Sequence, residues 1–103
     1  MLEAIGAIEE YTIHGRAAFF ADRRTQHAVE RNLTIIGEAV KNLSPGFRER
    51  YTEIEWRRVA GLRDKLVHDY PGVEVEIVWS VVERHLPLLR KVLTRAKGEI
   101  EGA

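Results

Sequence analysis

The chain is predicted to fold as an all-α bundle, in a single domain that covers residues 1–103. Apolar residues recur at steps of three and four between Val29 and Leu43, which is the pattern of a helix with one buried side. No segment alternates between apolar and polar residues as a half-buried strand would. Proline and glycine separate the helical segments, and no repeat or linker marks a second domain.

The first two helices are predicted from residues that stop or cap a helix. The first runs from the N-terminus to about His14 and stops at Gly15. The second begins behind Asp22 or Thr25, either of which can accept a hydrogen bond from a free amide at the helix start. Gly37 lies inside this helix, where glycine costs about 1 kcal/mol relative to alanine, so we expect a neighbour to approach its backbone closely.

The middle of the chain is predicted to hold a short helical turn and a third helix. The Ser-Pro-Gly sequence at 44–46 ends the second helix, and a single helical turn is expected over 47–51. The Thr-Glu-Ile-Glu sequence at 52–55 has the capping-box pattern and predicts the start of the third helix. That helix ends near Asp69, because the residue before Pro71 is disfavoured in the α region.

The last helix is predicted to begin near Val75 and to be kinked or broken at about His85. Pro87 is the cause, since its ring clashes with the preceding turn and it has no N–H to donate. The residues expected on the buried side of this helix are Ile77, Val78, Val81, Val82, Leu86, Leu89 and Leu93.

The composition limits the classes of protein to which the chain can belong. Sixteen basic and sixteen acidic residues cancel, although residues 41–68 carry seven basic against four acidic side chains, a net charge of +3. This local excess fits either a focused RNA contact, through Arg57, Arg58 and Lys65, or an ordinary solvated helix surface. The chain has no cysteine and no apolar run near the roughly 18 residues of a membrane span, so we expect a cytoplasmic protein without membrane contact.

Side chains suited to phosphate chemistry gather between Arg63 and Tyr70, directly before Pro71. The arginine has forked N–H donors, the histidine is of a type that titrates near neutrality, and the tyrosine supplies a phenol. On a regular helix Arg63 and His68 lie about 140° apart around the axis, so one helix cannot easily bring both to one phosphate oxygen. Either the helix unwinds before Pro71, or a second copy of the chain completes the site.

The same residues also have a purely structural interpretation. A histidine in the last turn of a helix interacts favourably with the helix dipole, Arg63 can be a surface charge, and Tyr70 can pack on the bundle. Asp64 lies four residues before His68, so its carboxylate can orient the imidazole. The sequence contains no histidine and glutamate pattern of a metal site, so metal-free acid–base chemistry without a cofactor is the function that these residues favour.

Arg63, His68 and Tyr70, at their spacing, resemble the R-x-x-x-x-H-x-Y motif of HepT-like ribonuclease toxins, which belong to the HEPN superfamily. The resemblance covers nearly the whole chain. Asp64 departs from the asparagine that often follows the motif arginine. The other blocks that look like this family are Gln26–Leu33, Ile35–Ala39, Trp56–Arg63 and Glu76–Trp79, and Asn32 and Glu38 lie in them without an assigned role.

The resemblance implies an antiparallel, up-and-down four-helix bundle with a short extra helix, which forms a homodimer and cleaves RNA without metal. The ribose 2′-hydroxyl would attack the adjacent phosphate, with His68 as general acid or base, Arg63 stabilising the developing charge and Asp64 in support. Such toxins are paired with a nucleotidyltransferase antitoxin of the MntA type, in a type VII-like toxin–antitoxin system. The antitoxin attaches AMP to the motif tyrosine, here Tyr70.

A rival hypothesis is a non-catalytic HEPN module that binds a nucleotide or RNA and acts as the scaffold of a nucleotidyltransferase complex. The complete set of arginine, histidine and tyrosine favours the enzyme, because a scaffold does not need all three. Growth arrest on expression of the chain alone, with cyclic-phosphate ends on cellular RNA, discriminates between the two hypotheses.

Overall fold

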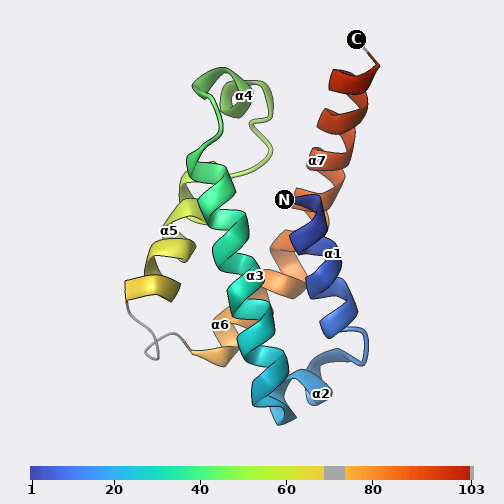
Figure 1. The fold of residues 1–103 in the computed structure, drawn as a ribbon, viewed down its shortest axis with the longest axis vertical. Coiled ribbons are helices and arrows are strands. Elements are labelled where there is room, and N and C mark those ends of the chain that lie inside the picture. The colour runs from blue at the N-terminus through green and yellow to red at the C-terminus, as the bar shows by residue number, and fades with distance from the viewer. Residues whose placement is uncertain (69–73, 103) are drawn as a thin grey trace.

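The computed structural model describes residues 1–68 and 74–102, and these residues form helices joined by short turns, with no strand among them (Figure 1). The predicted all-α class is therefore confirmed, whereas the antiparallel, up-and-down four-helix bundle and the homodimer stay predictions. The helices are α1 (Leu2–Tyr11), α2 (Gly15–Ala21), α3 (Arg23–Lys41), α4 (Pro45–Arg50), α5 (Trp56–His68), α6 (Val75–Ser80), the π-helical turn η1 (Val81–His85) and α7 (Leu86–Glu101).

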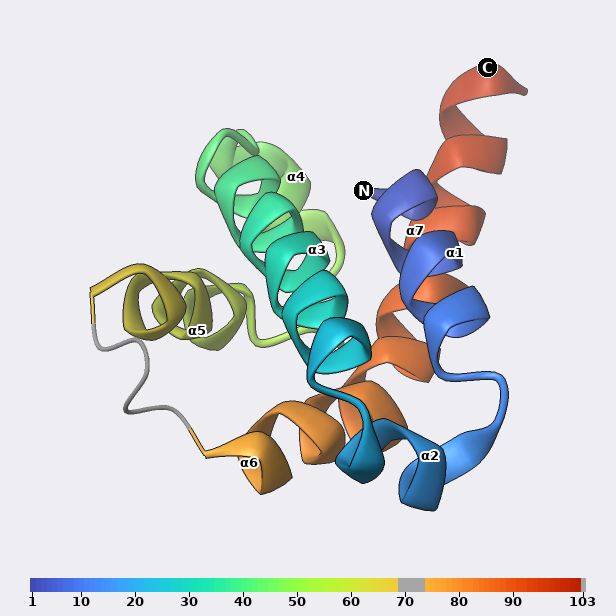
Figure 2. The same cartoon turned by 60° about the horizontal axis from the view of Figure 1, so that its bottom comes forward.

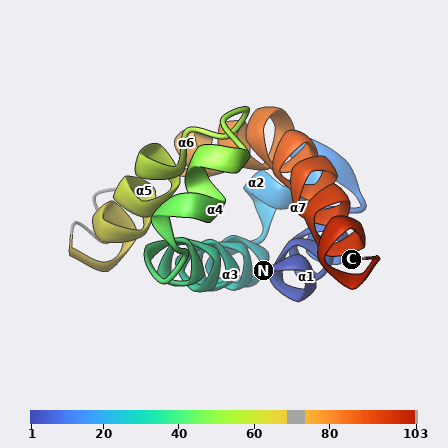
Figure 3. The same cartoon turned by 90° about the horizontal axis from the view of Figure 1, so that it is seen from above.

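Helix α3 is the central element of the fold. It packs against α1 on one side and against α5 on the other, and α7 lies beside α1. Helices α2 and α6 cover the end of α3 where that helix begins (Figure 2). Seen from above, α5, α3, α1 and α7 follow one another around an arc (Figure 3). The most deeply buried side chains are Ile5, Ile8, Phe19, Val29, Ile36, Val40, Val78 and Val92.

Several helix ends are where the sequence predicts them. The Asp22 carboxylate caps α3 by accepting a hydrogen bond from the Arg24 amide at 2.9 Å. Helix α4 confirms the predicted helical turn. The break expected from Pro87 is also present, as the π-helical turn that ends at His85, directly before α7 begins.

Two predicted boundaries were wrong. Helix α1 ends at Tyr11, and Gly15, which was expected to stop a helix, instead begins α2 with a φ of +86°. A positive φ is accessible to glycine at no steric cost, so the chain turns there and a new helix starts at once. Helix α5 begins at Trp56, one turn later than the capping-box pattern predicts. In the first turn of α5 the amide of Trp56 donates to the carbonyl of Ile54, and the amides of Arg58 and Val59 donate to the carbonyl of Glu55.

The predicted burial of Ile77 was wrong as well, since 48% of this side chain is exposed. It lies at a groove of about 410 Å³ that separates α5 from η1 and the start of α7. Val59 and Leu62 of α5, together with Val81 and Leu88, line the same groove. The arc of helices is therefore open on this side within the part of the chain that the structure describes.

Candidate functional site

Arg63 and His68 of the sequence motif lie on α5, and Arg63 lies where this helix packs tightly against α3. Gly37 of α3 faces Arg63 of α5 so tightly that a Cβ atom added to Gly37 would lie 2.2 Å from the Cβ of Arg63. Any side chain at this position would collide with the arginine. The close approach predicted from Gly37 is confirmed, and it holds the aliphatic part of Arg63 against the backbone of α3.

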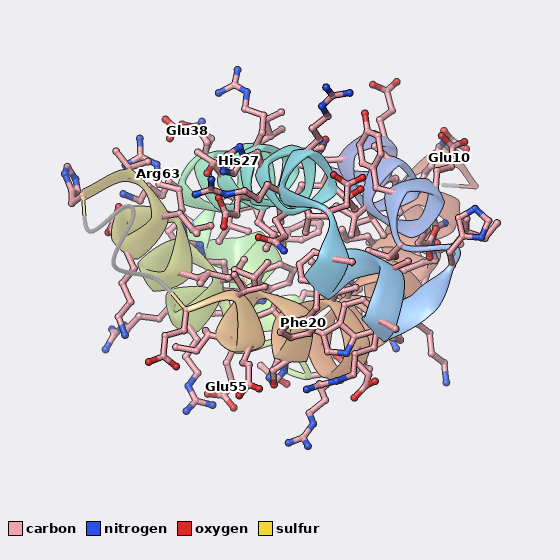
Figure 4. All side chains as sticks on the ribbon, turned by 90° about the horizontal axis from the view of Figure 1, so that it is seen from below. Glu10, Phe20, His27, Glu38, Glu55 and Arg63 are labelled. Atoms are coloured by element: carbon pink, nitrogen blue, oxygen red, sulfur yellow. The ribbon has the colours of Figure 1, made fainter. Side chains whose placement is uncertain are left out.

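The guanidinium of Arg63 is held by two carboxylates, one from each helix. Nη2 forms an ion pair with Oε2 of Glu38 at 2.7 Å, and Nη1 donates a hydrogen bond to Oδ1 of Asp64 at 3.2 Å. Figure 4 shows Glu38 and Arg63 on the same side of the molecule, on neighbouring helices. Only 22% of the Arg63 side chain is exposed, so the guanidinium is far better shielded than a typical surface arginine.

The carboxylate of Asp64 accepts hydrogen bonds from two cationic side chains, Lys41 and Arg63. Lys41, the last residue of α3, donates a short hydrogen bond to the carboxylate that also accepts from Arg63. The Lys41 ammonium, and then Arg63, hold the pKa of Asp64 below its ordinary value, with desolvation opposing them. Asp64 is therefore an anion at neutral pH and a charge partner of its neighbours.

His68 is the last residue of α5 and is exposed. Helix α5 is α-helical throughout, so the five-residue separation places His68 on a different side of the helix from Arg63. No hydrogen bond joins Asp64 to His68 among residues 1–68 and 74–102, so the role of Asp64 in orienting the imidazole stays a prediction. Tyr70 and Pro71, on which the predicted exit from the helix depends, lie outside the described residues.

The three residues suggested for RNA contact are all exposed on α5. Arg58 forms an ion pair with Glu55 at 3.4 Å, whereas Arg57 and Lys65 have no ion pair with any residue that the structure describes. Such solvated charges contribute little to stability, so they remain available to a partner. Their role in RNA binding stays a prediction.

Arg63, Asp64, Glu38 and Lys41 form one cluster of charged side chains. Two of its members, Glu38 and Lys41, had no role assigned to them from the sequence. The signal that could have found Glu38 is its position directly after Gly37, since a close helix contact also brings the flanking side chains to the neighbouring helix. Asn32 was left open too, and the structure gives it a local contact only, from its Nδ2 to the carbonyl of Ala28 at 2.9 Å.

The cluster can bind a phosphate through the oriented N–H groups of the Arg63 guanidinium, and not through a large net positive charge. Glu38 and Asp64 balance the charges of Arg63 and Lys41, so the four side chains together have no net charge. Within the described residues no three histidine, aspartate or glutamate side chains are grouped as a metal site would require. None of the described helices has the length and apolar character needed to cross a membrane.

Comparisons with known proteins agree with the motif. The family model described as "Ribonuclease HepT-like" matches residues 1–96. A protein of Thermococcus cleftensis named "Probable ribonuclease HepT" is 46% identical over 89 residues, which cover 85% of this chain and 81% of that protein. A protein of Methanocaldococcus jannaschii named "Putative RNase" is 44% identical over 84 residues, which cover 82% of this chain and 69% of that protein.

A further relative is a longer protein, and only part of it is similar to this chain. The Methanocaldococcus jannaschii protein named "Gamma-glutamylcyclotransferase and putative RNase" is 40% identical over 102 residues, or 98% of this chain. The chain spans 46% of the length of that relative. No solved structure matches the chain significantly. The match of the family model over nearly the whole sequence, and the extent of identity to these relatives, show that the chain belongs to the ribonuclease HepT-like family.

Proposed function

We propose that this chain is a metal-independent endoribonuclease that acts as a homodimer and serves as the toxin of a type VII-like toxin–antitoxin system. The observation that carries the proposal is the arrangement of Arg63 and His68 on α5. Arg63 is held in a fixed orientation at the contact with α3, whereas His68 is exposed on another side of the same helix. A phosphate bound to Arg63 therefore needs an imidazole from elsewhere.

A second copy of the chain is the simplest source of that imidazole. The unwinding alternative finds no support up to His68, because α5 stays helical to that residue. In a two-fold dimer the exposed faces of two α5 helices can meet, so that His68 of one copy approaches the Arg63 cluster of the other. The proposed active site is thus built from two protomers.

Gly61 supports contact between helices on this face of α5. It lies in the middle of the helix and is exposed, and a Cβ atom added to it would have no neighbour within 4 Å. No contact among residues 1–68 and 74–102 requires glycine here, although glycine costs about 1 kcal/mol relative to alanine inside a helix. Gly61 and His68 are seven residues apart and therefore share a face, so a partner helix close to Gly61 would also lie near His68.

The proposed reaction is an internal transfer at the RNA phosphate. His68 removes the proton of the ribose 2′-hydroxyl, whose oxygen then bonds to the adjacent phosphorus. The bond from phosphorus to the 5′-oxygen breaks, and that oxygen takes up a proton, which leaves a 2′,3′-cyclic phosphate and a free 5′-hydroxyl. Arg63 stabilises the negative charge on the pentacoordinate phosphorus through directed N–H donors.

Control of the toxin is proposed to come from a nucleotidyltransferase antitoxin that transfers AMP to Tyr70. Tyr70 is two residues beyond His68, so an added phosphodiester would place negative charge beside the site that receives the RNA phosphate. The cytoplasm, where RNA and such a partner are both present, is the proposed location.

The decisive experiment is incubation of the purified chain with total RNA, in the presence and absence of EDTA. We expect cleavage that EDTA does not reduce, with cyclic-phosphate ends on the products. Cleavage that requires a divalent cation would contradict the mechanism. Binding of RNA without any cleavage would instead favour the non-catalytic scaffold.

Replacing Arg63 with lysine is expected to lower the rate of RNA cleavage by about 10²- to 10³-fold. Lysine keeps the positive charge but loses the planar fork, so it cannot hold Glu38 and Asp64 while it also donates to a phosphate. The measurement is the initial rate on a fluorescently labelled RNA. Arg90→Lys is the control, because Arg90 forms an ion pair with Glu9 away from the motif. A wild-type rate for Arg63→Lys would rule out forked contact with the phosphate.

Replacing Gly61 with leucine is expected to shift the protein from dimer to monomer, because the new side chain would separate the two α5 helices. The single chain has room for it, so the helical circular dichroism signal should be retained. Sedimentation velocity measures the change, and Gly98→Leu on α7 is the matched control, since a Cβ at Gly98 also meets nothing within 4 Å. A Gly61→Leu protein that stays dimeric would place the interface elsewhere.

A further inference from the structure

We propose that Glu38 is a positioning residue of the active site, which fixes the direction of the Arg63 guanidinium so that its free donors face the RNA phosphate. The inference rests on the proposed nuclease function and extends it to a residue outside the R-x-x-x-x-H-x-Y motif. Its basis is the 2.7 Å contact from Nη2 of Arg63 to Oε2 of Glu38, which joins α5 to α3.

Helix α3 contacts both the aliphatic stem and the guanidinium of Arg63. The aliphatic stem of Arg63 lies against the backbone of Gly37, so closely that no side chain would fit at position 37. Glu38 follows directly along α3, so its carboxylate reaches the head of the same arginine. With stem and head both attached to α3, the guanidinium loses most of the rotational freedom that an arginine side chain otherwise has.

The donors of the guanidinium are only partly used. Nη2 is paired with Glu38 and Nη1 donates to Asp64, and each of these nitrogens carries two N–H groups. The Nε atom is buried and has no hydrogen-bond partner among the described residues. The buried Nε–H cannot reach a phosphate, so the donors that Arg63 keeps for one, while both carboxylates remain bound, are the second N–H groups of its two Nη atoms.

Orientation matters more than net charge at this site. The charges of Arg63 and Lys41 are balanced by those of Glu38 and Asp64, so this cluster itself has no net positive charge to attract the RNA backbone. A phosphate is then recognised through the direction of the N–H bonds, and a misdirected guanidinium loses transition-state contact. Asp64 is the neighbour of Arg63 on the same helix, so Glu38 is the residue that fixes the guanidinium relative to α3.

The test compares Glu38→Ala with the conservative variant Glu38→Gln, whose amide oxygen can still accept from Nη2. We expect Glu38→Ala to lower kcat by about 10- to 100-fold with less than about a twofold change in KM, and Glu38→Gln to restore most of kcat. Glu9→Ala is the matched control. Glu9 and Glu38 have similarly exposed side chains, 50% and 54%, and Glu9 also links two helices through an ion pair, with Arg90. The kcat of the Glu9→Ala protein should equal that of the wild type.

Two kinetic results would overturn the proposal. A Glu38→Ala protein with a lower KM or a higher kcat would mean that Glu38 competes with the phosphate for Arg63. A kcat equal to that of Glu9→Ala would make Glu38 an ordinary surface ion pair.

A readout without RNA separates this inference from the nuclease proposal. The side-chain Nε–H signal of Arg63, identified by its absence in Arg63→Lys, should exchange slowly with solvent in the wild type and in Glu38→Gln and fast in Glu38→Ala. This pattern in a protein that cleaves no RNA would retain the positioning role and reject the nuclease. An unchanged exchange rate in Glu38→Ala would reject the positioning role itself.

Discussion

The His68→Ala protein is expected to lose RNA cleavage by about 10²- to 10⁴-fold, which is the usual contribution of a positioned general acid or base. Alanine cannot accept the proton of the 2′-hydroxyl, and α5 contains no other histidine that could replace His68. Because His68 is exposed at the end of its helix, its removal leaves no cavity, and the thermal midpoint should change little. The single-turnover rate on a short RNA measures the effect.

A matched histidine distinguishes this result from a general loss of charge. His14 is also exposed and lies in the turn before α2, remote from the motif, so His14→Ala should cleave RNA at the wild-type rate.

Mixing the His68→Ala protein with the Arg63→Lys protein tests whether the active site is built from two protomers. If the site is built from two protomers, mixed dimers recover one site with both functional residues, and activity partly returns. Full activity of His68→Ala alone would remove the acid–base role.

The Gly37→Ala protein is expected to unfold about 1 to 3 kcal/mol more easily than the wild type, because the new methyl group would overlap the stem of Arg63. The added Cβ would lie 2.2 Å from the Cβ of Arg63, and both atoms belong to well-packed helices that cannot easily move. For a chain of this length, each kcal/mol corresponds to roughly 4–8 °C in the thermal midpoint. Differential scanning calorimetry and denaturant titration measure the change.

The same substitution should also lower RNA cleavage, since separation of α3 from α5 withdraws Glu38 from the guanidinium. Gly98→Ala provides the control: its Cβ would meet no atom within 4 Å, so alanine should stabilise α7 by about 1 kcal/mol through helix propensity. A Gly37→Ala protein as stable as the wild type would mean that α3 and α5 do not lie so close together in solution.

The features that could be read from the sequence are those that depend on neighbours within one helical turn. The Asp22 cap and the break before Pro87 were predicted correctly, because a carboxylate two residues from a free amide and a proline ring against the preceding turn act locally. Gly15 was misinterpreted for a related reason. A glycine is typical of a helix end, but the residues around it do not reveal that it will begin the next helix, as Gly15 begins α2.

The burial of individual side chains was harder to predict. Ile77 and Val78 are adjacent and similar in character, yet Val78 is buried and Ile77 is half exposed at the groove beside α5. Which of them is covered depends on where α5 and α3 lie, and periodicity within the last helix contains no information about that. The capping-box pattern at 52–55 was likewise overridden, because Trp56 is buried in the core and begins the helix there.

The sequence by itself determined the helical class, most helix ends and the chemical identity of the motif, since each depends on residue type and short spacing. Only the tertiary structure decided what surrounds Arg63. Glu38 and Arg63 are separated by 24 intervening residues, and they meet because a glycine lets α3 and α5 approach until stem and backbone touch. Contacts of this kind depend on how two helices cross, and the crossing is set by packing over the whole interface and not by any local pattern.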